Sequence, residues 1–177
     1  QILAGNDAQG FDVDINCQDT TVQYNYSHDN DGGFLLICTY GAEGYWNRNV
    51  IVRYNLSEND RQYIFSLGGK LTNVKIYNNT VYIPENSGAN LMSVTEWGYN
   101  VSATGLDVFN NLFYVAGNGF SSGFVPSAEY TFRNNMYFGA VSHRPIGTDD
   151  LLMDPKIVKP GGGPAGYKLK NDSPCID

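Results

Sequence analysis

The chain has 177 residues, the size of one domain, and its 42% hydrophobic and 14% aromatic content excludes general disorder. The net charge is −7 and the 11 Lys and Arg residues are scattered singly, so nucleic acid is not an expected partner. No apolar run is long enough to span a membrane, so no membrane partner is expected either. The 20 Gly and the many Asn residues disfavour helix and predict an all-β chain.

Alternating segments that run into Asn recur along the chain and superpose on one another. They occupy residues 20–27, 50–57, 74–81, 106–113 and 130–137. The Asn residues are separated by 30, 24, 32 and 24 positions; they are Asn25, Asn55, Asn79, Asn111 and Asn135. Alternation with period 2 predicts strands rather than helices.

A second apolar run follows most of these Asn residues, and an earlier copy precedes the first. These runs are residues 10–15, 33–38, 63–67, 91–95 and 119–122. Each period therefore holds two or three short strands joined by bends. Identical positions then stack about 4.8 Å apart, and an Asn side chain, with its donor and acceptor, can bond to its copies above and below. We therefore predict a parallel β-solenoid of about five or six coils with an internal Asn ladder.

The repeated pattern of apolar-x-apolar-x-Asn-Asn, as in residues 74–79 and 106–111, resembles the right-handed parallel β-helix proteins of the pectate-lyase-like superfamily. The ending, with Asp-Pro-Lys-Ile at 154–157 and Ser-Pro-Cys-Ile-Asp at 173–177, resembles the last coil of bacterial carbohydrate-active members. The resemblance implies a right-handed β-helix and a carbohydrate ligand. The Asn-Thr-Asp, Gly-His-Gly and Arg-Ile-Lys sets of the polygalacturonase branch are absent, so motif matching assigns no catalytic residue.

The repeat also divides the chain. Residues 1–150 are expected to form the β-helix coils, and residues 151–177 the final coil and a C-terminal capping segment. Enzymes of this superfamily usually have more coils, so we expect the chain to be the C-terminal part of a longer β-helix. The rest of that β-helix is then also an expected partner of these residues.

Paired carboxylates stand in the first run. Phe11 and Val13 are expected to point inward, which turns Asp12 and Asp14 outward on one face. Residues i and i+2 on a strand lie about 6.6 to 7 Å apart, a spacing typical of inverting glycosidases, and mutual repulsion would raise one pKa. Two solvated carboxylates, or two ligands of a cation, are the alternatives.

Titratable groups concentrate again in residues 26–32, which we interpret as a bend after the first ladder Asn. His28 titrates near neutrality and is a candidate acid or base, catalytic together with Asp31. Asp29 is a candidate for binding a sugar hydroxyl or orienting the imidazole. Because the next coil repeats Ser, acid and Asn here, a turn-forming role is the alternative for all but His28.

Aromatic residues next to acids are typical of sugar clefts, because pyranose rings expose C–H faces to π surfaces. Glu43 with Trp46, and Glu96 with Trp97, fit this description and lie in the longer insertions, which gather on one face of a solenoid. Arg61 is a candidate for binding acidic groups. The alternative role for each Trp is to close its loop onto the wall of the solenoid. The alternative for Arg61 is a solvated surface charge without a ligand.

Together these observations predict a secreted or periplasmic glycoside hydrolase that acts on an extracellular polysaccharide or oligosaccharide. A calcium-assisted polysaccharide lyase or epimerase is the alternative enzyme, favoured if Asp12, Asp14 and Asp31 bind Ca²⁺. A non-catalytic glycan-binding or adhesive solenoid is the third possibility. No cofactor and no other metal are expected.

Overall fold

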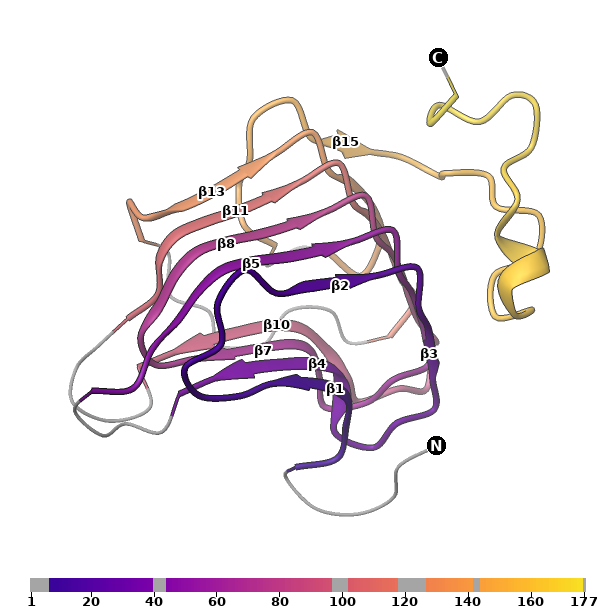
Figure 1. Cartoon of the computed structure of the whole chain (residues 1–177). Helices are drawn as coiled ribbons and strands as arrows, with labels where there is room; N and C mark the ends of the chain where they lie inside the picture. The colour runs from indigo at the N-terminus through magenta and orange to yellow at the C-terminus, as the bar shows by residue number, and fades with distance from the viewer. Residues whose placement is uncertain (1–6, 40–43, 97–101, 118–126, 142–143, 177) are drawn as a thin grey trace.

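The computed structural model describes residues 7–39, 44–96, 102–117, 127–141 and 144–176. These residues form an all-β parallel solenoid with three sheets, shown in Figure 1. The single helical element among them is the short 3₁₀ helix η1 (Pro164–Tyr167). No helix in the described part is long and apolar enough to cross a membrane.

Each sheet collects one strand from successive turns, and every strand pair is parallel. Sheet A contains β1 (Gln9–Val13), β4 (Gly33–Cys38), β7 (Tyr63–Gly68) and β10 (Asn90–Thr95). Sheet B contains β2 (Thr21–Gln23), β5 (Asn47–Arg53), β8 (Leu71–Tyr77), β11 (Thr104–Phe109) and β13 (Tyr130–Arg133). Sheet C contains β3 (Tyr26–His28), β6 (Leu56–Glu58), β9 (Thr80–Ile83), β12 (Leu112–Val115), β14 (Met136–Gly139) and β15 (Leu151–Leu152).

The register of sheet B confirms the superposition made from the sequence. Val22 pairs with Val52, Val52 with Ile76, Ile76 with Val108, and Val108 with Phe132. These five side chains point inward and form part of the apolar core. Stacking of equivalent positions therefore builds the core one turn at a time.

Within the described residues, four turns contribute a strand to all three sheets. β13 and β14 belong to a fifth turn and β15 to a sixth, so the expected five or six coils are reached when these turns, in which not every sheet has a described strand, are counted. The run predicted at residues 119–122 lies outside the described residues.

Residues 26–28 form strand β3 rather than the predicted bend. The strand is not apparent in the sequence because three residues are too few to show a period. Ser27 lies inward and buried, and its equivalents Ser57, Val81 and Phe113 do the same in the next turns. The outer positions on each side of it, Tyr26 and His28, face away from the core.

The internal Asn ladder is present at the corner between sheets B and C. Each ladder amide oxygen accepts two hydrogen bonds from the Asn one turn earlier: Asn79 Oδ1 accepts from the backbone N of Asn55 at 3.1 Å and from its Nδ2 at 2.9 Å. The same pair of bonds joins Asn25 to Asn55, Asn79 to Asn111, and Asn111 to Asn135. Because the backbone turns here, the ladder satisfies amide groups that would otherwise be buried without partners.

An aspartate ends the ladder. Asp150 Oδ1 accepts from Asn135 N at 2.9 Å, while its Oδ2 accepts from Gly147 N at 3.1 Å. A second, shorter ladder ends in the same way, since the fully buried Asp60 accepts two bonds from Asn30 and one from Ser57 Oγ. A carboxylate only accepts, so it suits the last member, which passes no hydrogen bond onward.

The residue before each ladder Asn has a left-handed backbone. The φ angle at this position lies between 53° and 57° in all six turns; the residues are Tyr24, Tyr54, Asn78, Asn110, Asn134 and Asp149. Asn and Asp adopt this conformation readily, whereas a bulky aromatic residue does so with strain. Tyr24 and Tyr54 are therefore unusual occupants of the corner.

Residues 153–176, here called the C-terminal segment, leave the solenoid after β15 and lie outside the three sheets (Figure 1). A short antiparallel bridge between Ile157 and Leu169 folds the segment back on itself. It is attached to sheet C where Gly163 N donates to Glu58 Oε2 at 3.0 Å. This attachment returns the end of the chain to the second turn.

Candidate functional site

The carboxylates of Asp12 and Asp14 lie on the outer face of sheet A, at the end of β1. Asp12 is exposed and Val13 between them is buried, so the strand alternates as the sequence predicted. Asp14 Oδ1 accepts hydrogen bonds from Ile15 N at 2.9 Å and from Cys38 Sγ at 3.4 Å. Asp14 is thus held in place, while Asp12 faces solvent.

The pKa of Asp12 is raised to about 6, first by desolvation at the sheet surface and then by the charges of Asp14 and Asp7. Burial and the hydrogen bond to Asp14 raise the pKa of the Cys38 thiol to about 12, so the thiol remains a donor at neutral pH. The site therefore holds a carboxyl group that protonates near pH 6 next to a carboxylate fixed by two donors.

Substituting Asp12→Asn is expected to stabilise the protein at pH 8 but not at pH 4. The folded pKa of about 6 exceeds the unfolded value, so wild-type stability falls as pH rises from about 4 to 6 and stays lowered above. Because the carboxylate is exposed and screened, the expected gain at pH 8 is only about 1 kcal/mol. Urea unfolding of both proteins at the two pH values measures it.

Asp19→Asn is the matched control, because hydrogen bonds from Asn49 and then Gln18 lower the pKa of this exposed carboxyl. Removing the Asp19 carboxylate should destabilise the protein at pH 8, so the change in stability has the opposite sign to that of Asp12→Asn. A gain from Asp12→Asn that is equal at both pH values would contradict the raised pKa of Asp12.

Trp46 lies at the same end of sheet A, one turn further on. Asn16 N donates to Trp46 O at 2.7 Å, and Trp46 N donates to Asn16 Oδ1 at 3.1 Å. Asn16 follows Asp14 by two residues. The backbone of Trp46 therefore lies next to the end of β1 that carries Asp12 and Asp14. The guanidinium of Arg48 lies 4.4 Å from the centre of its ring.

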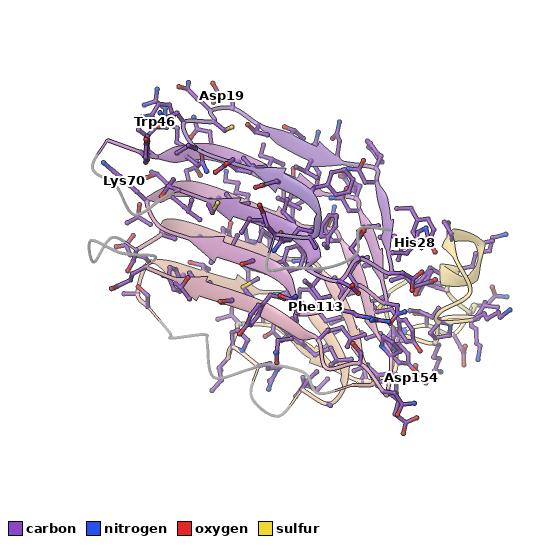
Figure 2. The ribbon with its side chains drawn as sticks, turned by 90° about the horizontal axis from the view of Figure 1, so that it is seen from below. Asp19, His28, Trp46, Lys70, Phe113 and Asp154 are labelled. Atoms are coloured by element: carbon purple, nitrogen blue, oxygen red, sulfur yellow. The ribbon has the colours of Figure 1, made fainter. Side chains whose placement is uncertain are left out.

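His28 projects from the outer face of sheet C, and Figure 2 places it at the opposite end of the molecule from Trp46. Its Nδ1 lies 2.8 Å from Oδ2 of Asp29, and its ring stacks on Tyr26 with centroids 4.7 Å apart. The hydrogen bond with His28, followed by that from Asn59, lowers the pKa of Asp29. His28 and Asp29 form a pair, but on another sheet from Asp12 and Asp14.

Asp31 lies at the corner between sheets C and A, where Arg61 Nη1 approaches its Oδ1 to 3.2 Å. Gly32 N donates to Ala8 O, which places Asp31 beside Asp7, just before the start of β1. That Asp31 shares a groove with Asp12 and Asp14 stays a prediction from the sequence. Arg61 instead lines a hollow of about 600 Å³, bordered further by Asn59, Gln62, Pro84, Asn86, Ser87 and Gly88.

The predicted sugar-binding residues in the insertions are divided. Glu43 and Trp97 lie outside the described residues. Glu96 is exposed after β10 and accepts from Ser102 Oγ at 3.0 Å. It stands three turns beyond Asp14, roughly 14 Å along the axis at about 4.8 Å a turn, so it is not part of the carboxylate pair.

Three contributors to these surfaces were not among the residues predicted from the sequence. Asp7 and Cys38 belong to the surroundings of the carboxylate pair, and Glu58 accepts from Tyr26 Oη at 3.0 Å on sheet C. Neither were Tyr24 and Tyr54, which lie at equivalent positions and stack with ring centroids 5.2 Å apart. The sequence could have identified these two Tyr residues, because the superposed repeats have Tyr at a corner position where the next three turns have Asn.

Within the described residues, no group of three or more His, Cys, Asp or Glu side chains is arranged to hold a metal ion. Calcium binding by Asp12, Asp14 and Asp31 stays a prediction from the sequence.

No protein-family model matches the chain. A stretch of 81 residues, 46% of the chain, is 42% identical to the lacto-N-biosidase of Bifidobacterium longum subsp. longum. The chain covers only 5% of the length of that relative. The similarity therefore relates part of this solenoid to part of a much larger protein.

Proposed function

We propose that this protein is a carbohydrate-active β-solenoid and that Asp12 and Asp14 hydrolyse a glycosidic bond. The observation that carries the proposal is the carboxyl pair at the end of β1, in which Asp12 has its pKa raised to about 6 beside a hydrogen-bonded Asp14. Two neighbouring carboxyl groups whose environments differ are the requirement for acid and base roles in glycoside hydrolysis.

In this proposal Asp12 is the general acid that protonates the leaving glycosidic oxygen. Asp14 is the general base that takes a proton from the attacking water. Positions i and i+2 of a strand are about 6.6 to 7 Å apart, which leaves room for that water and favours inversion at the anomeric carbon. Trp46, at the same end of β1, would offer its ring to a bound sugar.

The similarity to a lacto-N-biosidase supports a glycosidase, because that relative is a glycoside hydrolase by name. The match covers less than half of this chain, so the proposal takes from that relative the class of enzyme and not its substrate. Membership of the pectate-lyase-like superfamily is proposed on the sequence pattern alone. A polysaccharide substrate would further imply a secreted or periplasmic location.

A polysaccharide panel assayed at pH 5 to 8 tests the proposal. We expect new reducing ends without the ultraviolet absorbance of an unsaturated uronate, and a rate that falls as pH rises through about 6, because Asp12 must be protonated to act. Unsaturated products would favour the lyase instead. Binding without any product would leave a glycan-binding module.

A further inference from the structure

A groove runs along the corner between sheets B and C, beneath the C-terminal segment. It has a volume of about 370 Å³, within the range of small-ligand sites. Three consecutive turns and the C-terminal segment line it; the residues are Tyr24, Asn25, Tyr26, Tyr54, Asn55, Leu56, Asn78, Thr80, Pro164 and Tyr167. At about 4.8 Å a turn, the solenoid wall of the groove is roughly 10 Å long.

Tyrosine at this corner is unfavourable for the backbone. Tyr24 and Tyr54 have φ angles of 57° and 54°, while the next three turns have Asn at the same position. Aromatic residues at positive φ are genuine outliers, and such strained residues cluster at binding and active sites. The two turns that carry the strain are the two whose corner residues line the groove with aromatic rings.

The exposed rings suit a sugar. Tyr24 is 73% exposed and Tyr54 42% exposed, although they stack on each other. Tyr54 covers one face of Tyr24, which leaves the other face for the C–H face of a pyranose ring. Asn78 and Thr80 add an amide and a hydroxyl group, the hydrogen-bonding partners that sugar hydroxyls need.

The groove is neutral, and its outer wall is attached to the solenoid. None of the lining residues carries a charge. One cation and one anion stand just beyond them, the Arg53 guanidinium 5.5 Å from the centre of the Tyr54 ring and the Glu58 carboxylate, so there is no net positive charge to favour a uronic acid. Glu58, just beyond the lining, accepts from Tyr26 Oη and from Gly163 N, both at 3.0 Å. The bond from Tyr26 fixes Glu58, and the bond from Gly163 holds the C-terminal segment against sheet C, so the groove exists before a ligand binds.

We infer that this groove binds a neutral oligosaccharide, with a pyranose ring on the open face of Tyr24 and the adjoining units between Tyr54 and the C-terminal segment. The inference deepens the proposed function, on which it rests for the class of ligand. The groove lies on a different face from Asp12 and Asp14, so it is a second sugar site, separate from the catalytic pair.

The test uses the full chain with Asp14→Asn, so that ligand is not consumed, on an array of neutral and uronic-acid-containing oligosaccharides. Titration calorimetry then measures Kd for the strongest neutral ligand. Tyr24→Asn combined with Tyr54→Asn is expected to weaken binding at least about tenfold, because two aromatic contacts are lost. Asn is the residue that other turns already use at this corner, so the variant should keep its fold and unfolding temperature.

Two control variants separate the ring from the backbone. Tyr24→Phe keeps the stacking face and should stay within about threefold of the parent Kd. Asn110→Ala changes the same corner outside the groove and should leave Kd unchanged. An array without any signal, signals on uronic acids alone, or an unchanged Kd in the double Asn variant would overturn the inference.

The same data separate this inference from the proposed function. Tyr-dependent binding by a protein that hydrolyses no polysaccharide would uphold the groove and remove the catalytic proposal. Hydrolysis by the wild-type chain, with an unchanged Kd in the double Asn variant, would do the reverse.

Discussion

Replacing Asp14 by Asn is expected to lower kcat on the hydrolysed polysaccharide at least about a hundredfold, with KM little changed. The amide keeps the shape of the side chain and an oxygen that can accept from Ile15 N and Cys38 Sγ, as Oδ1 of Asp14 does. Only the charge and the basicity are lost. A loss confined to kcat therefore identifies a group that acts in the transition state rather than one that holds the fold. Initial rates over a range of substrate concentrations measure both constants.

His28→Asn and Asp31→Asn are the matched comparisons. Both were candidates for catalysis from the sequence, yet His28 lies on sheet C and Asp31 near the start of β1. We expect kcat within about threefold of wild type for each. A hundredfold loss in His28→Asn with full activity in Asp14→Asn would move the active site to sheet C and refute the carboxylate pair.

Asn79→Ala is expected to destabilise the protein by about 3 kcal/mol, the upper end for a buried hydrogen-bonding group. Asn79 is 2% exposed, and its Oδ1 accepts from both the backbone and the side chain of Asn55. Its Nδ2 donates to Asn111 Oδ1 at 2.9 Å and to Val52 O at 3.0 Å. Truncation leaves partners in two neighbouring turns buried and unsatisfied. Urea unfolding followed by circular dichroism measures the loss.

Two comparisons test whether the ladder causes this effect. Asn86→Ala removes an exposed amide and should change stability by less than about 0.5 kcal/mol. Asn25→Ala, half-buried in the first turn, should cost less than Asn79→Ala, because its side chain is less completely removed from water. Equal losses for Asn79 and Asn86 would contradict a stabilising ladder.

The repeat was readable because a solenoid places equivalent residues in direct contact. Val52 pairs with Val22 and Ile76, so the inward positions repeat an apolar type, and the ladder repeats Asn for its hydrogen bonds. Strand β3 was not readable, because three residues show no period and Ser27 is polar although buried. The predicted five or six coils correspond to four turns with a described strand in every sheet, followed by a fifth and a sixth to which β13, β14 and β15 belong.

The site divides in the same way. Alternation around Val13 was enough to turn Asp12 and Asp14 to one face, since it depends on neighbours in the chain alone. Whether His28 and Asp31 lie near Asp12 and Asp14 depends on where the chain turns from one sheet to the next. Because residues 26–28 form the additional strand β3, His28 lies on sheet C rather than at a bend next to sheet A. The partners Asp7 and Cys38 could not be predicted, because their contacts with the pair depend on chain paths that a sequence pattern does not specify.

By itself, then, the sequence determined the all-β solenoid, its register and its Asn ladder, because these follow from residues that repeat at each turn and meet their own copies. The tertiary structure alone decided that His28 lies on a different sheet from Asp12 and Asp14, and it returned the C-terminal segment to Glu58 in the second turn. Residues 105 positions apart meet there through a contact that no repeat encodes. The groove beside Tyr24 and Tyr54 exists for that reason, since one of its walls comes from the repeat and the other from the segment that leaves it.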